Sequence, residues 1–222
     1  MNFARNHKYF TSPSAVSGKT VVIGAIIGII FLFVKFIFGL LVLVALGVYI
    51  YFKVKGKIKD SDIDLEYQKG MTDVVKKGLD KLGIDEEEVK LIDPIVIHGP
   101  YYKNIVSGYY TRKGEDNRWR SSNYEVTVLY FSEKQVYSYN YRFSIVNSEK
   151  NESTDEYFYK DIVSVSTSSD TITTNNNETF NLEYFKLTTS GGTSISCAIW
   201  DMGEVEKSIR GMKQLLREKK SE

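Results

Sequence analysis

The residue types that most often carry catalysis are scarce in this chain of 222 residues. The two histidines, His7 and His98, stand on opposite sides of a long apolar run, so they form no pair at a metal-binding spacing. The single cysteine, Cys197, alternates with Ile195 and Ile199, which is typical of a buried strand residue and not of a nucleophile. Neither a P-loop nor a Gly-x-Ser-x-Gly elbow is present. The sequence therefore predicts no enzyme, no cofactor and no metal site.

A basic stretch is the better candidate for chemistry, and its polar centre, Gly-Glu-Asp-Asn, is typical of a hairpin tip. The candidate residues are Arg112, Lys113, Arg118, Trp119 and Arg120. Converging cations can hold a phosphate by charge-assisted hydrogen bonds, and an indole ring suits a membrane interface. Glu115 and Asp116 cancel part of the positive charge. The stretch is thus either an anion site or an ordinary solvated hairpin with Trp119 packed on the domain.

An unbroken apolar run extends from Thr20 to Phe52, and Lys35 is its only charged residue. A helix over these residues would be about 50 Å long, whereas a hydrocarbon core is about 30 Å thick. We therefore expect a membrane segment, either one transmembrane helix or a membrane hairpin with Lys35 at its tip. Residues 33–37 contain no Gly, Pro or Asn to make a turn, which favours the single helix. Basic residues on both flanks favour the hairpin, and both forms stay open.

Two glycines in this run, Gly24 and Gly28, have the Gly-x-x-x-Gly spacing that lets helix backbones approach closely. They predict a helix–helix contact, through which the chain would form homo-oligomers. The alternative is that they are glycines scattered in an apolar helix.

The charge of the chain is divided unevenly. Residues 1–59 carry eight Lys and Arg and no acidic residue, so the remainder carries 21 basic and 28 acidic residues. A basic cluster follows the apolar run directly and consists of Lys53, Lys55, Lys57 and Lys59. By the positive-inside rule, this cluster predicts that the following domain faces the cytoplasm, and a lone cysteine fits a reducing compartment. The acidic domain argues against nucleic acid as a partner, whereas the basic flanks favour anionic membrane lipids.

Beyond the basic cluster the pattern is first helical and then alternating. Apolar residues at three- and four-residue spacing predict a helix over 60–82 that Gly83 ends, with one more short turn after it. From Ile95 to Trp200, aromatic and apolar residues alternate with polar ones, which predicts antiparallel strands. The expected strands are 101–111, 124–130, 137–145, 157–167, 180–189 and 193–200, and residues 147–156 are expected to form a polar turn.

The last element is an expected C-terminal helix that begins at Asp201 and carries the apolar stripe Val205, Ile209, Met212 and Leu216. The predicted fold class is α+β: a membrane helix or helical hairpin, a helical linker, then an antiparallel open barrel or sandwich capped by this helix in the manner of a pleckstrin-homology-like domain. We divide the chain into a basic tail (1–19), the membrane segment (20–52), a basic then helical linker (53–94) and a β domain (95–222).

Residues 101–219 resemble a pleckstrin-homology-like domain of the kind found in bacterial membrane proteins. The resemblance rests on the order of the elements and on the local sequences FYKDIVSVS and FKLTTSGGTSI. It implies that the first hairpin binds lipid headgroups through a lysine, a spacer and a basic-x-basic pattern. Lys113, Arg118 and Arg120 match that pattern by residue type.

These observations lead to two expectations about function. The first is a membrane-anchored, non-enzymatic binding or scaffold module that presents a protein- or lipid-interaction surface at the cytoplasmic face of the cell membrane. The alternative is a subunit of an oligomeric channel or transport complex, with the β domain as its regulatory part. The expected partners are membrane lipids, a protein, and a second copy of the chain bound through the apolar run.

Overall fold

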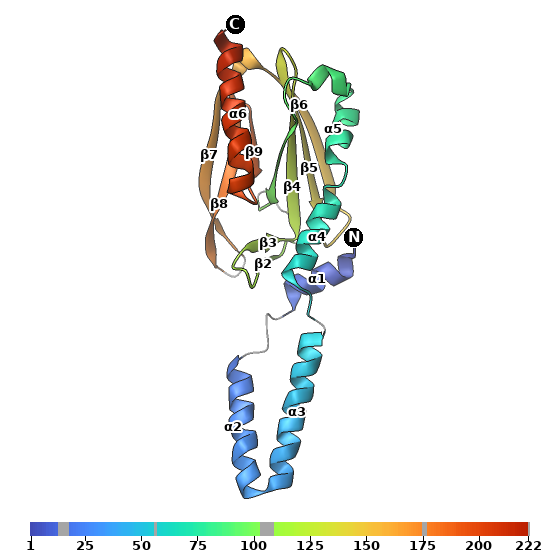
Figure 1. Cartoon of the computed structure of the whole chain (residues 1–222), viewed down its shortest axis with the longest axis vertical. Coiled ribbons are helices and arrows are strands. Elements are labelled where there is room, and N and C mark those ends of the chain that lie inside the picture. The colour runs from blue at the N-terminus through green and yellow to red at the C-terminus, as the bar shows by residue number, and fades with distance from the viewer. Residues whose placement is uncertain (13–17, 56, 103–108, 175–176, 222) are drawn as a thin grey trace.

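The computed structural model describes residues 1–12, 18–55, 57–102, 109–174 and 177–221. The chain is α+β, with helices first, antiparallel sheets next and one helix last. A pair of helices projects from the rest of the molecule, which we call the body (Figure 1).

The projecting pair is a helical hairpin, formed by α2 (Gly18–Val34) and α3 (Phe36–Lys55), which pack side by side (Figure 1). The chain reverses at Lys35. A close approach at this turn requires glycine, because a Cβ on Gly39 would lie 2.7 Å from Cα of Leu32. Residues 33–37 contain no glycine, which favoured a single helix, but the glycine that the turn requires is Gly39, two positions further on.

The expectation of a transmembrane helix is wrong. Among the described residues, none of the helices combines the length and the apolar character that crossing a membrane requires. The turn at Lys35 divides the apolar run between two helices. It leaves 17 residues in α2, a length of about 26 Å, whereas a hydrocarbon core is about 30 Å thick.

Four short helical segments cover one side of the body. They are α1 (Phe3–Thr11), α4 (Asp60–Gly70), α5 (Val74–Leu82) and the 3-10 turn η1 (Glu86–Val89). The single helix expected over 60–82 is divided because Asp73 adopts a left-handed conformation, with φ of 58°. Gly83, with φ of 68°, ends α5 as predicted.

The first sheet has the strand order β1-β4-β5-β6 and is antiparallel throughout. Its strands are β1 (Ile95–Pro100), β4 (Asn123–Phe131), β5 (Gln135–Ser144) and β6 (Lys150–Phe158). One face of β4 and β5 packs on α4 and α5 through residues such as Val126 and Tyr139. The other face, with Leu129 and Phe131, belongs to a second cluster that includes α6. Both faces of the sheet are thus covered.

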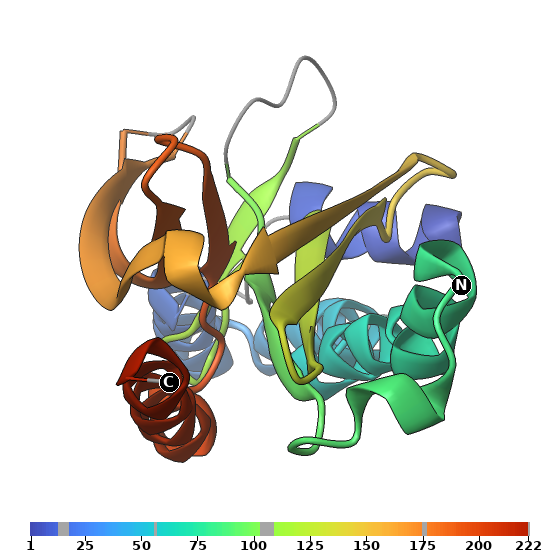
Figure 2. The ribbon, with the colours of Figure 1, turned by 90° about the horizontal axis from the view of Figure 1, so that it is seen from above.

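The second sheet and the last helix complete the body. The strand order is β7-β8-β9, and a separate small hairpin is formed by β2 and β3. The bounds are β2 (Thr111–Lys113), β3 (Trp119–Ser121), β7 (Ile162–Thr173), β8 (Thr179–Thr189), β9 (Ser194–Ala198) and α6 (Met202–Ser221). The predicted stripe of α6 is buried, and Figure 2 shows α6 on the side of the body opposite α5.

The expected barrel is not formed, because the strands make separate sheets that do not close. A 3-10 turn, η2 (Tyr159–Asp161), interrupts the strand expected over 157–167, so that β6 and β7 belong to different sheets. Residues 147–156, expected as a polar turn, supply most of β6. This strand is an edge strand with mostly exposed side chains, so it shows little of the alternation that marks a half-buried strand.

Candidate functional site

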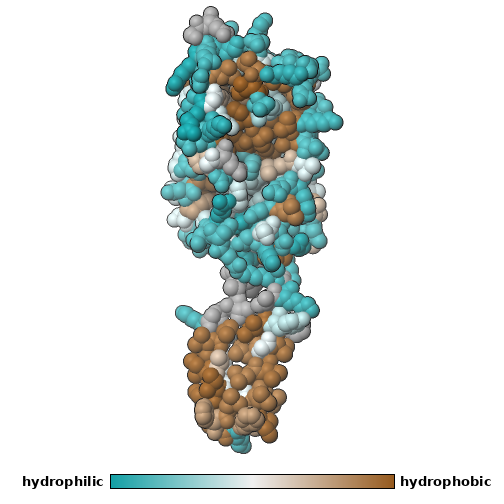
Figure 3. Space-filling model, in the orientation of Figure 1, coloured by the Kyte–Doolittle hydropathy of each residue, from teal (hydrophilic) through white to brown (hydrophobic). Residues whose placement is uncertain are grey.

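The basic residues gather where the hairpin leaves the body. We call this region the junction and define it as α1, the end of α3, the start of α4 and the β2–β3 hairpin. These segments, far apart in the sequence, meet at the lower end of the body in Figure 1. Most of the exposed charged residues of the junction are cations. Figure 3 shows that the hairpin surface below the junction is apolar.

Arg120 is the structural centre of the junction. Its side chain is only 1% exposed, and it donates to Asp64 from Nε and Nη2 at 2.8 Å each. It also donates to Asp116, from Nη1 at 2.9 Å and Nη2 at 2.8 Å. Two bidentate carboxylate contacts use the whole guanidinium fork. Arg120 therefore fastens the β2–β3 hairpin to α4, and its side chain does not face solvent as a lipid-binding cation would.

Two other predicted headgroup residues also contact the protein itself. Arg112 donates to the backbone carbonyl of Tyr9 and lies over the Tyr9 ring, 4.6 Å from its centroid. Trp119 stacks on Phe180 with a centroid distance of 4.7 Å and an interplanar angle of 12°. Arg112 therefore docks α1 onto β2, and Trp119 links β3 to β8.

The remaining members of the predicted headgroup site are Arg118 and Lys113. Arg118 lies 3.6 Å from Asp201 and faces the Trp200 ring, whereas Lys113 is exposed. Arg118 and Arg120 thus both lie over the Trp200 ring, at 5.7 and 5.6 Å, but each is also paired with carboxylates of the protein. The structure does not bring Lys113, Arg118 and Arg120 together around one phosphate-sized space.

The Arg120 contacts predict acid lability of the body. The hydrogen bond from Arg120 lowers the pKa of Asp116 to about 2. A carboxyl group with a pKa lower in the folded than in the unfolded state stabilises the fold above the unfolded pKa, near 4. That stability is lost as pH falls from about 4 towards 2. In urea unfolding series across this range, Asp116→Asn should flatten the decline in stability, and an unchanged slope would contradict this assignment.

The predicted basic cluster flanks the end of the hairpin. Lys55 ends α3 and is exposed, and Lys57 forms an ion pair with Glu115 of the β2–β3 hairpin. The backbone N–H of Lys59 donates to Asp62 at 3.1 Å, at the start of α4. The side chain of Lys53 lies outside those that the structure describes.

The first residues of the chain, expected as a tail, form part of this site. Asn2 caps α1 by accepting from the N–H of Arg5 at 3.1 Å. Asn6 and Tyr9 are buried; Asn6 donates to the carbonyl of Ile145 at 2.8 Å and the hydroxyl of Tyr9 donates to Asp60 at 2.7 Å. The asparagine cap and the spacing of three residues between Asn6 and Tyr9 were the available signals for this helix.

An open cleft of about 630 Å³ lies between α1 and the connection from α3 to α4. Four of the seven residues that line it are cations, and none is acidic: they are Arg5, Lys8, Lys55 and Lys57. Lys55 and Lys57 were predicted as members of the basic cluster, whereas Arg5 and Lys8 were not predicted as site residues, because nothing local indicates that α1 folds back onto the end of α3.

The hairpin carries the largest apolar surface of the described residues. Among the described residues, all but five of the exposed large apolar side chains belong to this hairpin. The five on the body are Met1, Phe3, Leu65, Phe158 and Val163. The predicted glycine pair faces inward. A Cβ on Gly24 would lie 3.1 Å from Leu46, and one on Gly28 would lie 2.6 Å from Leu43, both in α3. Gly24 and Gly28 therefore allow α2 and α3 to pack within one chain.

The residues with catalytic potential are positioned as structural groups. Cys197 is fully buried, and burial raises the pKa of its thiol well above the usual value. His98 lies 2.8 Å from the hydroxyl of Tyr124. Within the described part of the chain, no three His, Cys, Asp or Glu side chains are placed to hold a metal ion.

Comparison of the chain with family models, with curated proteins and with solved structures finds no match. The site must therefore be interpreted from its own geometry.

Proposed function

We propose that the chain is a non-enzymatic binding module that docks on one face of a lipid membrane through the α2–α3 hairpin. In this proposal neither helix crosses the membrane, and both ends of the hairpin stay on the side of the body. The body is then held at the lipid surface, where it offers its own faces to protein partners.

The observation that carries the proposal is the exposure of apolar side chains all along both helices (Figure 3). Examples are Ile30 (55% exposed), Leu41 (59%) and, beside the tip, Phe33 (89%). Monomeric soluble proteins rarely expose contiguous apolar patches larger than a few hundred Å². This surface therefore needs a covering, and a covering on every side is what lipid chains provide.

The polar end of the hairpin also supports lipid as the occupant. Tyr49 and Tyr51 are exposed in the last two turns of α3, at the level where tyrosine is enriched at membrane interfaces. Lys19, Lys55 and Lys57 lie next to them at the base. Lysines at this level attract anionic headgroups, and the cytoplasmic leaflet is the anionic one. We therefore assign the body to the cytoplasmic side.

The order of elements in the body supports the proposed kinship with pleckstrin-homology-like domains. Four main strands form one sheet, three form the next, and α6 follows them. The β2–β3 hairpin, however, is used for internal contacts. For this reason the proposal places lipid contact on the α2–α3 hairpin and not on Lys113, Arg118 and Arg120.

Co-flotation of the full chain with phosphatidylcholine vesicles tests the proposal. Leu41→Asp places a carboxylate in the half of α3 that is next to the tip, where a charge in hydrocarbon costs about 3 kcal/mol, so binding should fall about 100-fold. Leu65→Asp is the matched control, because Leu65 is 48% exposed on the body and its replacement should not change binding.

Two outcomes would overturn the proposal. One is flotation of Leu41→Asp at the wild-type level. The other is a wild-type chain that does not float with the vesicles and is a discrete oligomer, because its hairpin would then be covered by protein.

A further inference from the structure

We infer that the cleft between α1 and the end of α3 binds the phosphate of an anionic phospholipid, and that Lys8 and Lys55 are its principal ligands. This inference rests on the proposed function and adds the class of lipid that the junction selects. It also gives α1 a role, since α1 supplies half of the cations in the cleft.

The charge balance of the cleft favours an anion. Arg5 pairs with Asp62 at 2.6 Å, and Lys57 pairs with Glu115, so these two cations are each balanced by one carboxylate. Lys8 and Lys55 add two further positive charges, and both side chains are exposed. An ammonium group is a strong point-charge donor to phosphate oxygen, and two such groups can share one phosphate.

The nearby carboxylates of Asp60 and Asp62 accept from donors of the protein and do not line the cleft. Asp60 accepts from the hydroxyl of Tyr9 at 2.7 Å and from the N–H of Glu115 at 2.7 Å. Asp62 accepts from Arg5 and from the N–H of Lys59. The hydrogen bond from the N–H of Lys59, together with the contact from Arg5, lowers the pKa of Asp62.

The position of the cleft matches the height of a headgroup. Lys55 is the last residue of α3, and the ammonium of Lys55 lies 5.2 Å from the centroid of the Tyr51 ring one turn below. A lipid whose chains lie along the apolar hairpin would have its phosphate beside Lys55. Lys55 thus belongs both to the hairpin and to the lining of the cleft, which places the cleft at the polar end of the apolar surface.

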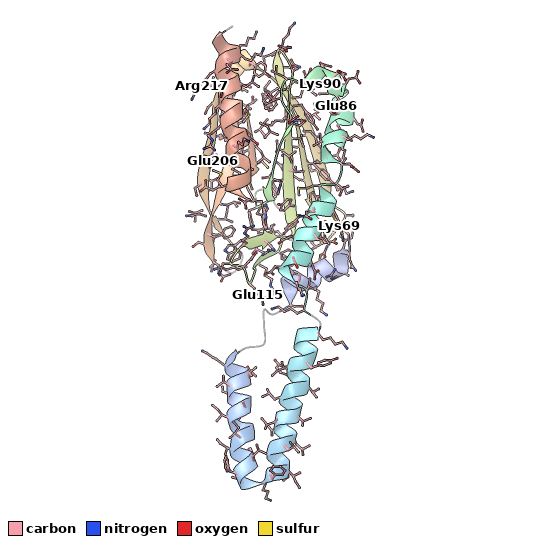
Figure 4. The ribbon with its side chains drawn as sticks, viewed as in Figure 1. Lys69, Glu86, Lys90, Glu115, Glu206 and Arg217 are labelled. Carbon is pink, nitrogen blue, oxygen red and sulfur yellow. The ribbon has the colours of Figure 1, made fainter. Side chains whose placement is uncertain are left out.

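A second basic cleft provides the matched control. Lys213, Arg217 and Lys220 of α6 line a cleft of about 350 Å³ against β7. Figure 4 shows Arg217 at the end of the body away from the hairpin and Glu115 at the end next to it. When the hairpin is in lipid, the α6 cleft is held away from the surface, although its charge is similar.

The test compares full-length variants on two kinds of vesicle, one of phosphatidylcholine alone and one with equal parts of phosphatidylglycerol. The wild-type chain should bind the anionic vesicles more tightly. Lys8→Ala combined with Lys55→Ala should reduce this preference about 30-fold, because each cation near an anionic surface contributes about fivefold. Binding to neutral vesicles should not change. Lys213→Ala combined with Lys220→Ala should leave the affinities for neutral and for anionic vesicles as in the wild type.

The outcomes separate this inference from the proposed function. A fall of about 100-fold in vesicle binding of Leu41→Asp, with the preference for anionic vesicles lost only in the Lys8 and Lys55 double variant, supports both. A wild-type chain that binds both vesicles equally overturns the headgroup site alone. If the Lys213 and Lys220 double variant loses the preference for anionic vesicles to the same extent, the effect is due to net charge, and the headgroup site is also overturned. Binding of inorganic phosphate by the lipid-free chain, lost in the Lys8 and Lys55 double variant, would assign the cleft to a soluble phosphate instead.

Discussion

Replacement of Arg120 by methionine is expected to lower the free energy of unfolding by about 3 kcal/mol, because it leaves Asp64 and Asp116 without their shared cation. The guanidinium is 1% exposed and makes four hydrogen bonds to these two carboxylates. Methionine fills a similar volume but neutralises neither acid. Urea unfolding of the full chain, followed by tryptophan fluorescence, measures the change.

Two further substitutions make this prediction specific. Arg120→Lys keeps the charge but loses the planar fork, so its cost should lie between those of the wild type and the methionine variant. Arg118→Met removes a cation two residues away whose side chain is 52% exposed, and it should change stability by less than about 1 kcal/mol. Equal effects of Arg118→Met and Arg120→Met would contradict the structural role of Arg120.

Replacement of Gly99 by alanine is expected to destabilise the body by about 2 to 3 kcal/mol through overpacking. A Cβ at this position would lie 2.6 Å from the carbonyl oxygen of Ala198 and 2.7 Å from its carbonyl carbon. Both are backbone atoms of β9, which Glu125 also holds by accepting from the N–H of Ala198 at 2.8 Å. The two sheets would therefore have to separate where β1 meets β9.

Gly211→Ala is the matched control, because the new methyl group would meet no atom within 4 Å. Gly211 lies within α6, where alanine is favoured over glycine by about 0.5 to 1 kcal/mol. The two Gly→Ala variants should thus change the melting temperature in opposite directions. A melting temperature of Gly99→Ala at or above the wild-type value would show that the sheets do not approach as closely as described.

Several parts of the fold were predictable because they depend on local periodicity. The alternation in β4 and β5 identified the buried face of both strands, including Val126 and Tyr139. The four-residue stripe of α6 identified its buried side, and Met212 is fully buried. Such patterns record which side of an element is apolar, and an apolar side is buried whatever packs on it. The identity of the packing element is not contained in the pattern.

The roles of the basic residues depend on partners distant in the sequence. Arg120 has the residue type and spacing of a headgroup ligand, yet Asp64, 56 residues earlier, accepts two of its hydrogen bonds. Lys8 and Lys55 are unremarkable in the sequence and become one site only because α1 docks on the body through Asn6 and Tyr9. Spacing along the chain reports nothing about contacts of this kind.

The sequence by itself determined that residues 20–52 are apolar and that the flanking residues are basic, since both are matters of composition. Only the tertiary structure decided whether the apolar run forms one long helix or a helical hairpin. A single long helix and a hairpin bury similar side chains, and the choice between them depends on whether α2 and α3 can pack closely. Gly39 permits that packing because it lies against the backbone of Leu32, where a methyl group would not fit. Gly24 and Gly28 bring α2 against the side chains of Leu46 and Leu43, which would have to shift to admit a methyl group.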